Sequence, residues 1–363
     1  MTGLRGFAAL MVAIYHIDSE LIGPTPIGQL VGKGYLWVDL FFVLSGFVLA
    51  MNYGDLFAEG WSMRRWGEFL LKRAARTYPL YLFVLLPATA YAAALGSVQL
   101  SPHLPSPTPL PHPAIDVAAN LALVQSWGVG PSIDGTAWSL STEWAAYYLF
   151  PILAAHALFS SRRVAVGFTL AAAALAIATA LLTHYDGAYH SGPLDAYSGT
   201  TIEPLLRCLG GFGVGMVSYR IACANSSCGW LGRDAALLCI LALIVLGMSS
   251  GANDLLIYPL FAPLVLGLYR CAGFITRHSA NGFLYRAGIL SYSIYLLHPF
   301  LVAPHQGLVG EFSKRLPAPW AAVLASAATF ALLFAISEVT YRCIERPGRR
   351  WVRQLGRGVL GRA

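Results

Sequence analysis

The chain has 363 residues, of which 57% are hydrophobic and only 11% are charged, and its mean hydropathy is +0.61. Soluble globular proteins carry about a quarter charged residues, so this composition excludes an ordinary soluble domain and indicates a polytopic membrane protein. The net charge of +7 is also typical of nucleic-acid-binding proteins. Here, however, Lys and Arg lie in short tracts between apolar segments, which indicates membrane topology and no nucleic-acid partner.

Apolar windows of about 20 residues, the length of helix that crosses roughly 30 Å of hydrocarbon, occur ten times along the chain. They lie near residues 3–21, 35–53, 78–96, 137–158, 164–183, 202–221, 235–250, 254–271, 287–303 and 318–340. We therefore predict an all-α polytopic membrane protein with about ten transmembrane helices.

The distribution of basic residues predicts the orientation of these spans. If the N-terminus is cytoplasmic, the inner segments hold 20 of the 24 Lys and Arg residues. Because basic residues concentrate on the cytoplasmic side of a membrane, both termini are predicted to be cytoplasmic. We expect one transmembrane domain over residues 1–345, a basic cytoplasmic tail over residues 346–363, and no appended soluble domain.

The longest outer segment, residues 97–136, contains the proline-rich stretch SPHLPSPTPLPHP, which cannot continue a helix. The following stretch, AIDVAANLALVQSW, could lie flat on the membrane surface. The six cysteines show no paired metal-ligand spacing, so we expect neither a disulfide framework nor a zinc site.

The first span, in LRGFAALMVAIYH, carries an ionisable residue at each end. Eleven residues separate Arg5 from His16, which is three helical turns plus about 20° and a rise of about 16 Å, so both lie on one helix face. Arg5 alone could be a positive-inside anchor, and His16 could make only an interhelical hydrogen bond. Ionisable residues this deep in a membrane more often line a functional cavity.

Three further ionisable residues are predicted at the depth of His16, in the outer half of the membrane: Asp39, Glu143 and His298. Lipid penalises each of them separately, so a shared polar cavity is the simplest explanation. A histidine beside a carboxylate is a common general base. The depths permit His16 to meet either Asp39 or Glu143 and do not choose between them.

The stretch LLKRAARTYPLY places Lys72, Arg73 and Arg76 within one and a half helical turns on the inner side. Such a cluster could simply hold anionic lipid. Guanidinium groups also bind phosphate bidentately, so the cluster is a candidate clamp for a phosphate or pyrophosphate.

These motifs together resemble the acyltransferase 3 family of bacterial membrane O-acyltransferases, of the O-antigen acetylase type. The matching residues are, in chain order, Arg5, His16, Asp39, Phe41, Phe42, Ser45, Gly46, Arg73, Arg76, Trp138, Ser139, Leu140, Glu143, Ser291, Tyr292, Tyr295, His298, Pro299, Tyr341, Arg342, Glu345 and Pro347. The resemblance covers nearly the whole chain. One departure is Trp144, which stands where family members often carry a second glutamate.

The resemblance implies an O-acyltransferase of the bacterial cytoplasmic (inner) membrane. It would move an acyl group, commonly acetyl, from cytoplasmic acyl-CoA to a hydroxyl on an extracytoplasmic or membrane-associated glycan or lipid-linked saccharide, with no metal. His16 would be the catalytic base, Arg5 its companion, and Arg73 with Arg76 the contacts to coenzyme A. A covalent intermediate, if there is one, has three untested candidate nucleophiles: Ser45, Ser139 and Ser291.

Two other functions fit the same residues. The chain could be a transporter or flippase for a glycan, lipid or acyl donor that uses the intramembrane charges to move its substrate; the absence of an inverted repeat counts mildly against this. A polytopic scaffold without turnover would leave the buried histidines and carboxylates unexplained.

Overall fold

The computed structural model describes residues 1–95, 97–98, 108–110, 112–183, 192–197, 200–224, 226–271, 273–275 and 282–360. Its helices are α1 (Thr2–Ile17), α2 (Pro26–Gly32), α3 (Leu36–Tyr53), α4 (Met63–Leu95), α5 (Pro113–Ala122), α6 (Trp138–Ala154), α7 (Arg162–Leu182), α8 (Glu203–Ala224), α9 (Asp234–Ser249), α10 (Asp254–Ile257), α11 (Phe261–Arg270), α13 (Phe283–Ile289), α14 (Ser291–Leu297), α15 (Val302–Ser313), α16 (Ala318–Thr340) and α17 (Arg346–Leu360). Strands β1 (Ser97–Val98) and β2 (Thr108–Pro109) form a short antiparallel ladder.

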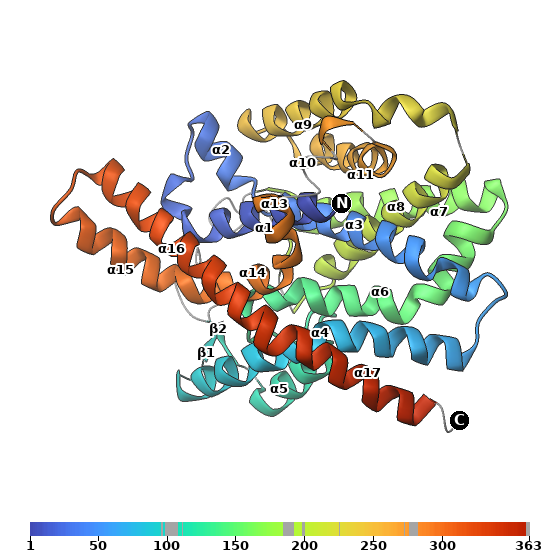
Figure 1. Cartoon of the computed structure of the whole chain (residues 1–363), viewed down its shortest axis with the longest axis horizontal. Helices are drawn as coiled ribbons and strands as arrows, with labels where there is room; N and C mark the ends of the chain where they lie inside the picture. Colours follow the sequence, from blue (N-terminus) through green and yellow to red (C-terminus); the bar gives the residue numbers. More distant parts are fainter. Residues whose placement is uncertain are drawn as a thin grey trace.

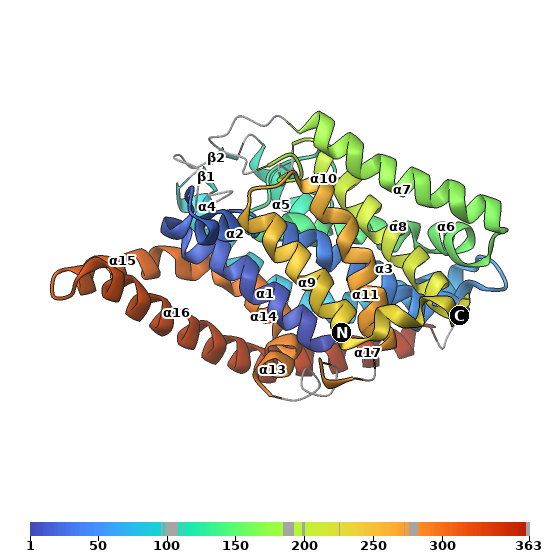
Figure 2. The same cartoon turned by 90° about the horizontal axis from the view of Figure 1, so that it is seen from above.

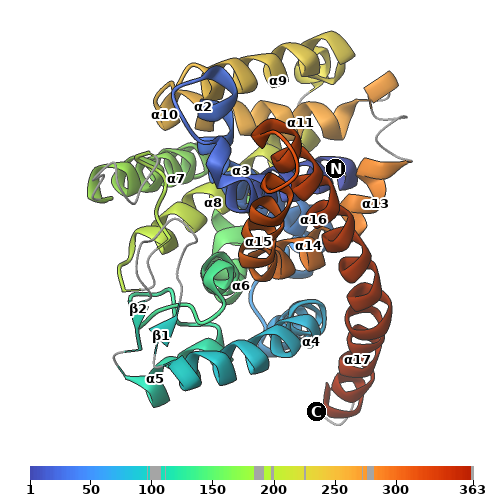
Figure 3. The ribbon, with the colours of Figure 1, turned by 90° about the vertical axis from the view of Figure 1, so that its left-hand side faces the viewer.

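The helices form a bundle in which most of the long ones run roughly along the longest axis of the molecule (Figure 1). Helices α15 and α16 form an antiparallel pair whose far end projects beyond the bundle, as both Figure 1 and Figure 2 show. Helix α17 continues from α16 through a π-helical turn, Tyr341–Glu345, and lies alongside α4 (Figure 3).

The predicted all-α membrane class is confirmed, and each of the ten apolar windows coincides with helical structure. Within the described part of the chain, four helical segments are long and apolar enough to cross a membrane: Leu36–Phe57, Met63–Ala94, Arg162–Leu182 and Ala318–Gly356. A fifth span is possible if Phe283–Ile289 and Ser291–Ser313, which meet at a 69° bend, are counted together. The ten-span topology and the cytoplasmic termini stay predictions.

Close backbone contacts fix the central helices against one another. A Cβ atom added to Gly46 of α3 would lie 1.9 Å from the carbonyl oxygen of Phe212, and one added to Gly215 of α8 would lie 2.0 Å from that of Val43. Small residues allow membrane helices to approach this closely. Helix α1 is held against α13 in the same way, because Gly288 leaves no room for a side chain beside the carbonyl of Thr2.

The predicted surface helix after the proline-rich stretch corresponds to α5, while most of that stretch, residues 99–107 and 111, lies outside the described residues. No disulfide joins the five cysteines whose side chains the structure describes, and the side chain of Cys228 lies outside that set.

Candidate active site

His16 lies in the last turn of α1 and contacts a second histidine. Its Nδ1 atom lies 2.9 Å from the carbonyl oxygen of Val12 and 3.1 Å from Nε2 of His298. The two imidazole rings have their centroids 4.9 Å apart. His298 is fully buried at the start of the 3₁₀ turn that follows α14. One partner of His16 is therefore an imidazole from another helical segment, whereas the sequence had suggested carboxylates.

The backbone fixes the tautomers of this histidine pair. A carbonyl oxygen only accepts hydrogen bonds, so Nδ1 of His16, facing the oxygen of Val12, carries a proton. Nδ1 of His298 faces the carbonyl oxygen of Ile294 at 3.2 Å and is protonated for the same reason, which leaves Nε2 of neutral His298 as an acceptor for His16. The basic lone pair of neutral His16 is consequently on Nε2.

His16 lines a small pocket of about 30 Å³. The other described lining residues come from five separate segments: Tyr15, Tyr35, Val38, Gly135, Thr136, Trp138, Asp195, Tyr197 and Tyr295. Tyr15 donates a hydrogen bond to Asp195 across this pocket at 3.4 Å. The pocket thus includes an acidic side chain, Asp195, that was not among the candidates from the sequence.

A much larger cavity, of about 950 Å³, opens between α1, α3, α4, α6, α14 and α17. Seven cationic side chains line it, against the two acids Glu68 and Glu143; the cations are Arg5, Arg64, Lys72, Arg73, Arg76, Arg349 and Arg353. This excess of positive charge suits a ligand with several negative charges.

Arg5, Arg73 and Arg76 lie deep in this cavity, enclosed by the fold but with part of each side chain facing the open space. Arg73 donates a hydrogen bond to the hydroxyl of Tyr147 at 3.1 Å and stacks over the same ring, while its Nε atom is buried without a partner among the described residues. The guanidinium groups of Arg5 and Arg76 make no hydrogen bond with another described residue. All three predicted basic residues of this group therefore face one cavity.

The remaining sequence candidates divide between the two spaces. Glu143 lines the large cavity with Arg5 and does not line the pocket of His16. The three candidate nucleophiles Ser45, Ser139 and Ser291 also line the large cavity, as does Tyr292, whose hydroxyl donates to the carbonyl of Thr77 at 2.7 Å. The hydroxyl of Ser291 is buried without a hydrogen-bond partner among the described residues. Lys72 lines the same cavity and pairs with Glu68 one turn earlier, at 2.6 Å.

The large cavity and the pocket of His16 share a wall made by Val38 and Tyr295. The hydroxyl of Tyr295 lies 2.7 Å from Oγ of Ser139 and donates to the carbonyl of Thr136 at 3.2 Å. Its ring contacts the ring of His298 edge to face, with centroids 5.8 Å apart. Tyr295 therefore lies between the cationic cavity and the histidine pair.

Asp39 lines neither space, and its carboxylate is fully buried in an ion pair with Arg207 of α8. The guanidinium donates to both carboxylate oxygens, at 2.9 and 2.7 Å, and to two backbone carbonyls. It also lies over the ring of Trp138, at 5.3 Å. The expected single cavity for four ionisable groups is therefore not what the structure shows: His16 meets His298, Glu143 accompanies Arg5, and Asp39 pairs with Arg207.

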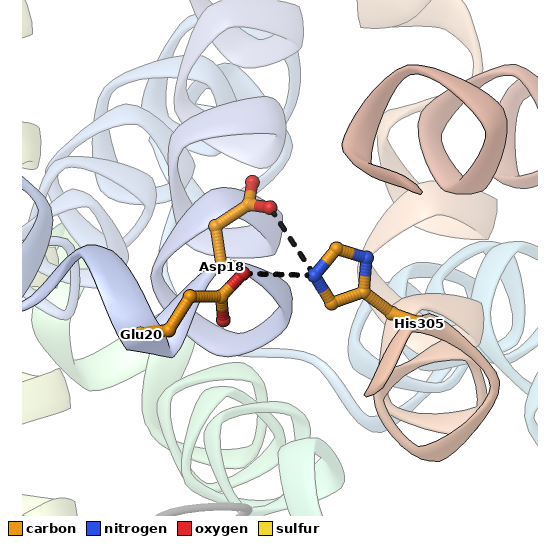
Figure 4. A group of neighbouring side chains, drawn as sticks. All are labelled: Asp18, Glu20 and His305. Atoms are coloured by element: carbon orange, nitrogen blue, oxygen red, sulfur yellow. Dashed lines mark hydrogen bonds and ion pairs between the residues drawn. The ribbon is translucent and has the colours of Figure 1, made fainter. Parts of the chain in front are cut away.

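A second group of ionisable residues, missed from the sequence, lies just after His16. Nε2 of His305 lies 3.0 Å from a carboxylate oxygen of Glu20 and 3.6 Å from one of Asp18 (Figure 4). The ligand atoms of the three residues lie within 4.8 Å of one another, close enough to hold a metal ion. Thr329 contacts the other nitrogen of His305, and Ser326 donates to Asp18. This cluster ties the end of α1 to α15 and α16.

Comparison with known proteins now decides the family. The family model described as an acyltransferase domain, that of acyltransferase 3, matches residues 1–338. The chain belongs to the acyltransferase 3 family. With its apolar helices, this makes the protein a membrane acyltransferase.

Two curated relatives agree with this membership. "Protein 2 in picA locus" of Rhizobium radiobacter is 34% identical over 170 residues, which is 45% of this chain and 82% of that protein. "Acyltransferase MdmB" of Streptomyces mycarofaciens is 36% identical over 163 residues, which is 42% of this chain but only 38% of that protein. No solved structure matches the chain.

Proposed function

We propose that this protein transfers an acyl group, commonly acetyl, from cytoplasmic acyl-CoA to a hydroxyl of an extracytoplasmic or membrane-associated glycan or lipid-linked saccharide. The observation that carries the proposal is the arrangement of two spaces, a cationic cavity and a histidine-lined pocket, on either side of Tyr295. The bacterial inner membrane is the proposed location, with the cationic cavity open to the cytoplasm.

The cationic cavity is the proposed donor site. Coenzyme A carries a pyrophosphate and a ribose phosphate, and arginines bind such groups through paired hydrogen bonds. Arg73 and Arg76 stand one helical turn apart on α4, and both side chains line the cavity. We assign the pyrophosphate to this pair, since both are less exposed than Arg64 and Arg353, which line the same cavity.

The pocket of His16 is the proposed reaction site. A hydroxyl has too high a pKa to attack a thioester unassisted, so a base must take its proton as the attack proceeds. In our scheme Nε2 of His16 accepts that proton while the acceptor oxygen bonds to the thioester carbonyl carbon. The carbon–sulfur bond then breaks, and the proton passes from His16 to the departing sulfur of coenzyme A.

This scheme requires the thioester to pass Tyr295, because the ring stands between the donor cavity and His16. The pantetheine arm of coenzyme A is long and narrow, so a small displacement of one side chain gives it a path. A tunnel past Tyr295 is therefore our preferred route over a relay of acyl groups.

The test combines donor binding with acyl transfer. We expect purified wild-type protein to bind acetyl-CoA, His16→Ala to bind it equally well without transferring the acetyl group, and Arg73→Ala with Arg76→Ala to bind it at least about tenfold more weakly. Transfer is measured by mass spectrometry of surface glycans and lipids from cells that express each variant, as the gain or loss of an acyl mass.

His156→Ala is the matched control for His16, because His156 makes the same bond to the carbonyl four residues earlier, at 2.9 Å, but lies exposed at the end of α6. Full acyl transfer by the His16→Ala variant would contradict the proposal that His16 is the general base. If acetyl-CoA is never consumed while a glycan or lipid still crosses vesicle membranes, the protein is a transporter and the whole proposal is wrong.

A further inference from the structure

Helix α17 lies beyond residue 338, where the match to the family ends, yet it is fitted closely to α4. A Cβ atom added to Gly348 would lie 2.4 Å from Cβ of Pro79, and one added to Gly356 would lie 1.9 Å from a methyl carbon of Leu71. Helix α17 therefore packs directly on α4 at these two glycines, which are about two turns apart (Figure 3). The segment expected as a basic tail is in this structure a fixed wall of the donor cavity.

Two arginines of α17 complete the lining of that cavity. Arg349 and Arg353 are one helical turn apart, so they share a face of the helix. They meet Arg64, from the first turn of α4, at the same cavity. Arg64 and Arg353 are both exposed, whereas Arg73 and Arg76 are enclosed. Arg64 and Arg353 therefore lie at the rim of the cavity, and Arg349 is partly buried one turn before Arg353. We use "rim arginines" for Arg64, Arg349 and Arg353.

The rim arginines have unused hydrogen-bonding capacity. Arg349 binds Glu345 through Nη2 at 2.7 Å, but its Nε atom is buried and has no partner among the described residues. Arg64 and Arg353 take part in no ion pair within the described part of the chain. Arg64 and Arg353 thus offer two guanidinium groups, unpaired within the described residues, at the wall of one cavity, which suits an anionic ligand because arginine binds phosphate through paired hydrogen bonds.

We propose that the rim arginines bind the ribose 3′-phosphate of coenzyme A, an inference that rests on acyl-CoA being the donor. The 3′-phosphate is at the end of coenzyme A opposite the thioester. If the thioester points inwards to Tyr295, the pyrophosphate reaches the enclosed pair Arg73 and Arg76, and the 3′-phosphate is left at the rim. The cavity thus has two phosphate subsites, one on α4 and one completed by α17.

The experiment compares coenzyme A with 3′-dephospho-coenzyme A, which differs only in this phosphate. Dissociation constants are measured on the full-length protein in a neutral detergent, so that anionic lipid does not compete for the arginines. We expect the wild type to bind coenzyme A at least about tenfold more tightly than dephospho-coenzyme A. Arg64→Ala with Arg353→Ala is expected to weaken coenzyme A binding to the dephospho level while changing dephospho-coenzyme A binding by less than about twofold.

Arg350→Ala is the matched control, since Arg350 is exposed on the same helix and does not line the cavity; it should bind both ligands as the wild type does. Arg349→Gln is a third variant, and thermal unfolding of each protein checks that it remains folded. Equal loss of affinity for both ligands in the double variant, or a wild type that does not distinguish them, overturns the rim subsite and leaves the donor site intact. A wild type that binds neither ligand overturns the proposed function itself.

Discussion

Nδ1 of His16 and Nε2 of His298 lie 3.1 Å apart, and this contact links α1 to the 3₁₀ turn after α14. The carbonyl of Val12 keeps the proton on Nδ1 of His16 and the basic lone pair on Nε2, and the contact with His298 holds the orientation of the His16 ring. We therefore treat His298 as a positioning residue for the proposed base.

We expect His298→Leu to lower kcat for acyl transfer by about 100-fold, within the range that a general base contributes, with the dissociation constant of acetyl-CoA unchanged. His298→Gln keeps an oxygen that can accept from His16 and should recover part of the rate. Rates come from release of the coenzyme A thiol in the presence of acceptor-bearing membranes. Full activity in the leucine variant, or no difference between the two variants, would contradict the positioning role.

Breaking the buried pair of Asp39 and Arg207 should destabilise the protein. Asp39→Asn leaves the charge of Arg207 buried without a counter-ion, so it is expected to lower the free energy of unfolding by about 3 kcal/mol. Asp39→Leu together with Arg207→Met should recover part of this loss, because a buried ion pair replaced by apolar residues is often close to neutral. Thermal unfolding in detergent measures both.

The same double variant tests whether Asp39 acts in the reaction. Because Asp39 lines neither the donor cavity nor the pocket of His16, we expect the folded double variant to retain acyl transfer. A double variant that is folded, binds acetyl-CoA and transfers nothing would instead support the catalytic role expected from the sequence.

Tyr295 separates the donor cavity from His16, so its removal should join the two spaces. In Tyr295→Ala, water gains access to the thioester beside the base, and we expect acetyl-CoA hydrolysis without acceptor to rise by roughly tenfold, equivalent to about 1.4 kcal/mol. Tyr295→Phe keeps the ring and should hydrolyse acetyl-CoA at the wild-type rate. Hydrolysis is measured in the wild type and in both variants as the release of the free coenzyme A thiol. Equal rates in all three proteins would mean that the ring of Tyr295 is not the barrier between the two spaces.

The group of Asp18, Glu20 and His305 should hold the end of α1 in place. We expect His305→Leu to lower the free energy of unfolding by about 1 kcal/mol, since it removes the hydrogen bond to Glu20 while Asp18 keeps the one from Ser326. Acyl transfer should fall as well, because His16 is two residues from Asp18. EDTA is expected to leave the stability of the wild type unchanged, since Nε2 of His305 and the carboxylate of Glu20, 3.0 Å apart, form a hydrogen bond without a metal ion. A loss of stability with EDTA would point to a bound divalent cation.

Much of the site can be predicted from the sequence, because charged residues are rare within membrane-spanning segments and are therefore easy to recognise there. Arg5, Arg73, Arg76 and Glu143 were all singled out from the sequence, and they line one cavity. The pairing of Asp39 with Arg207 had a signal too, since Arg207 is a basic residue within the apolar window 202–221. Its significance was missed because depth along a helix does not give the direction in which a side chain points.

The sequence by itself determined the membrane class, the positions of the helices and the family, because hydropathy and short motifs are local properties of the chain. Only the tertiary structure decided that His16 meets His298, that Tyr295 lines both spaces, and that Arg349 and Arg353 of α17 line the cationic cavity. The physical reason is that such contacts depend on the order and rotation of neighbouring helices. Those are set by packing between distant segments, such as the glycine contacts of α3 with α8 and of α17 with α4.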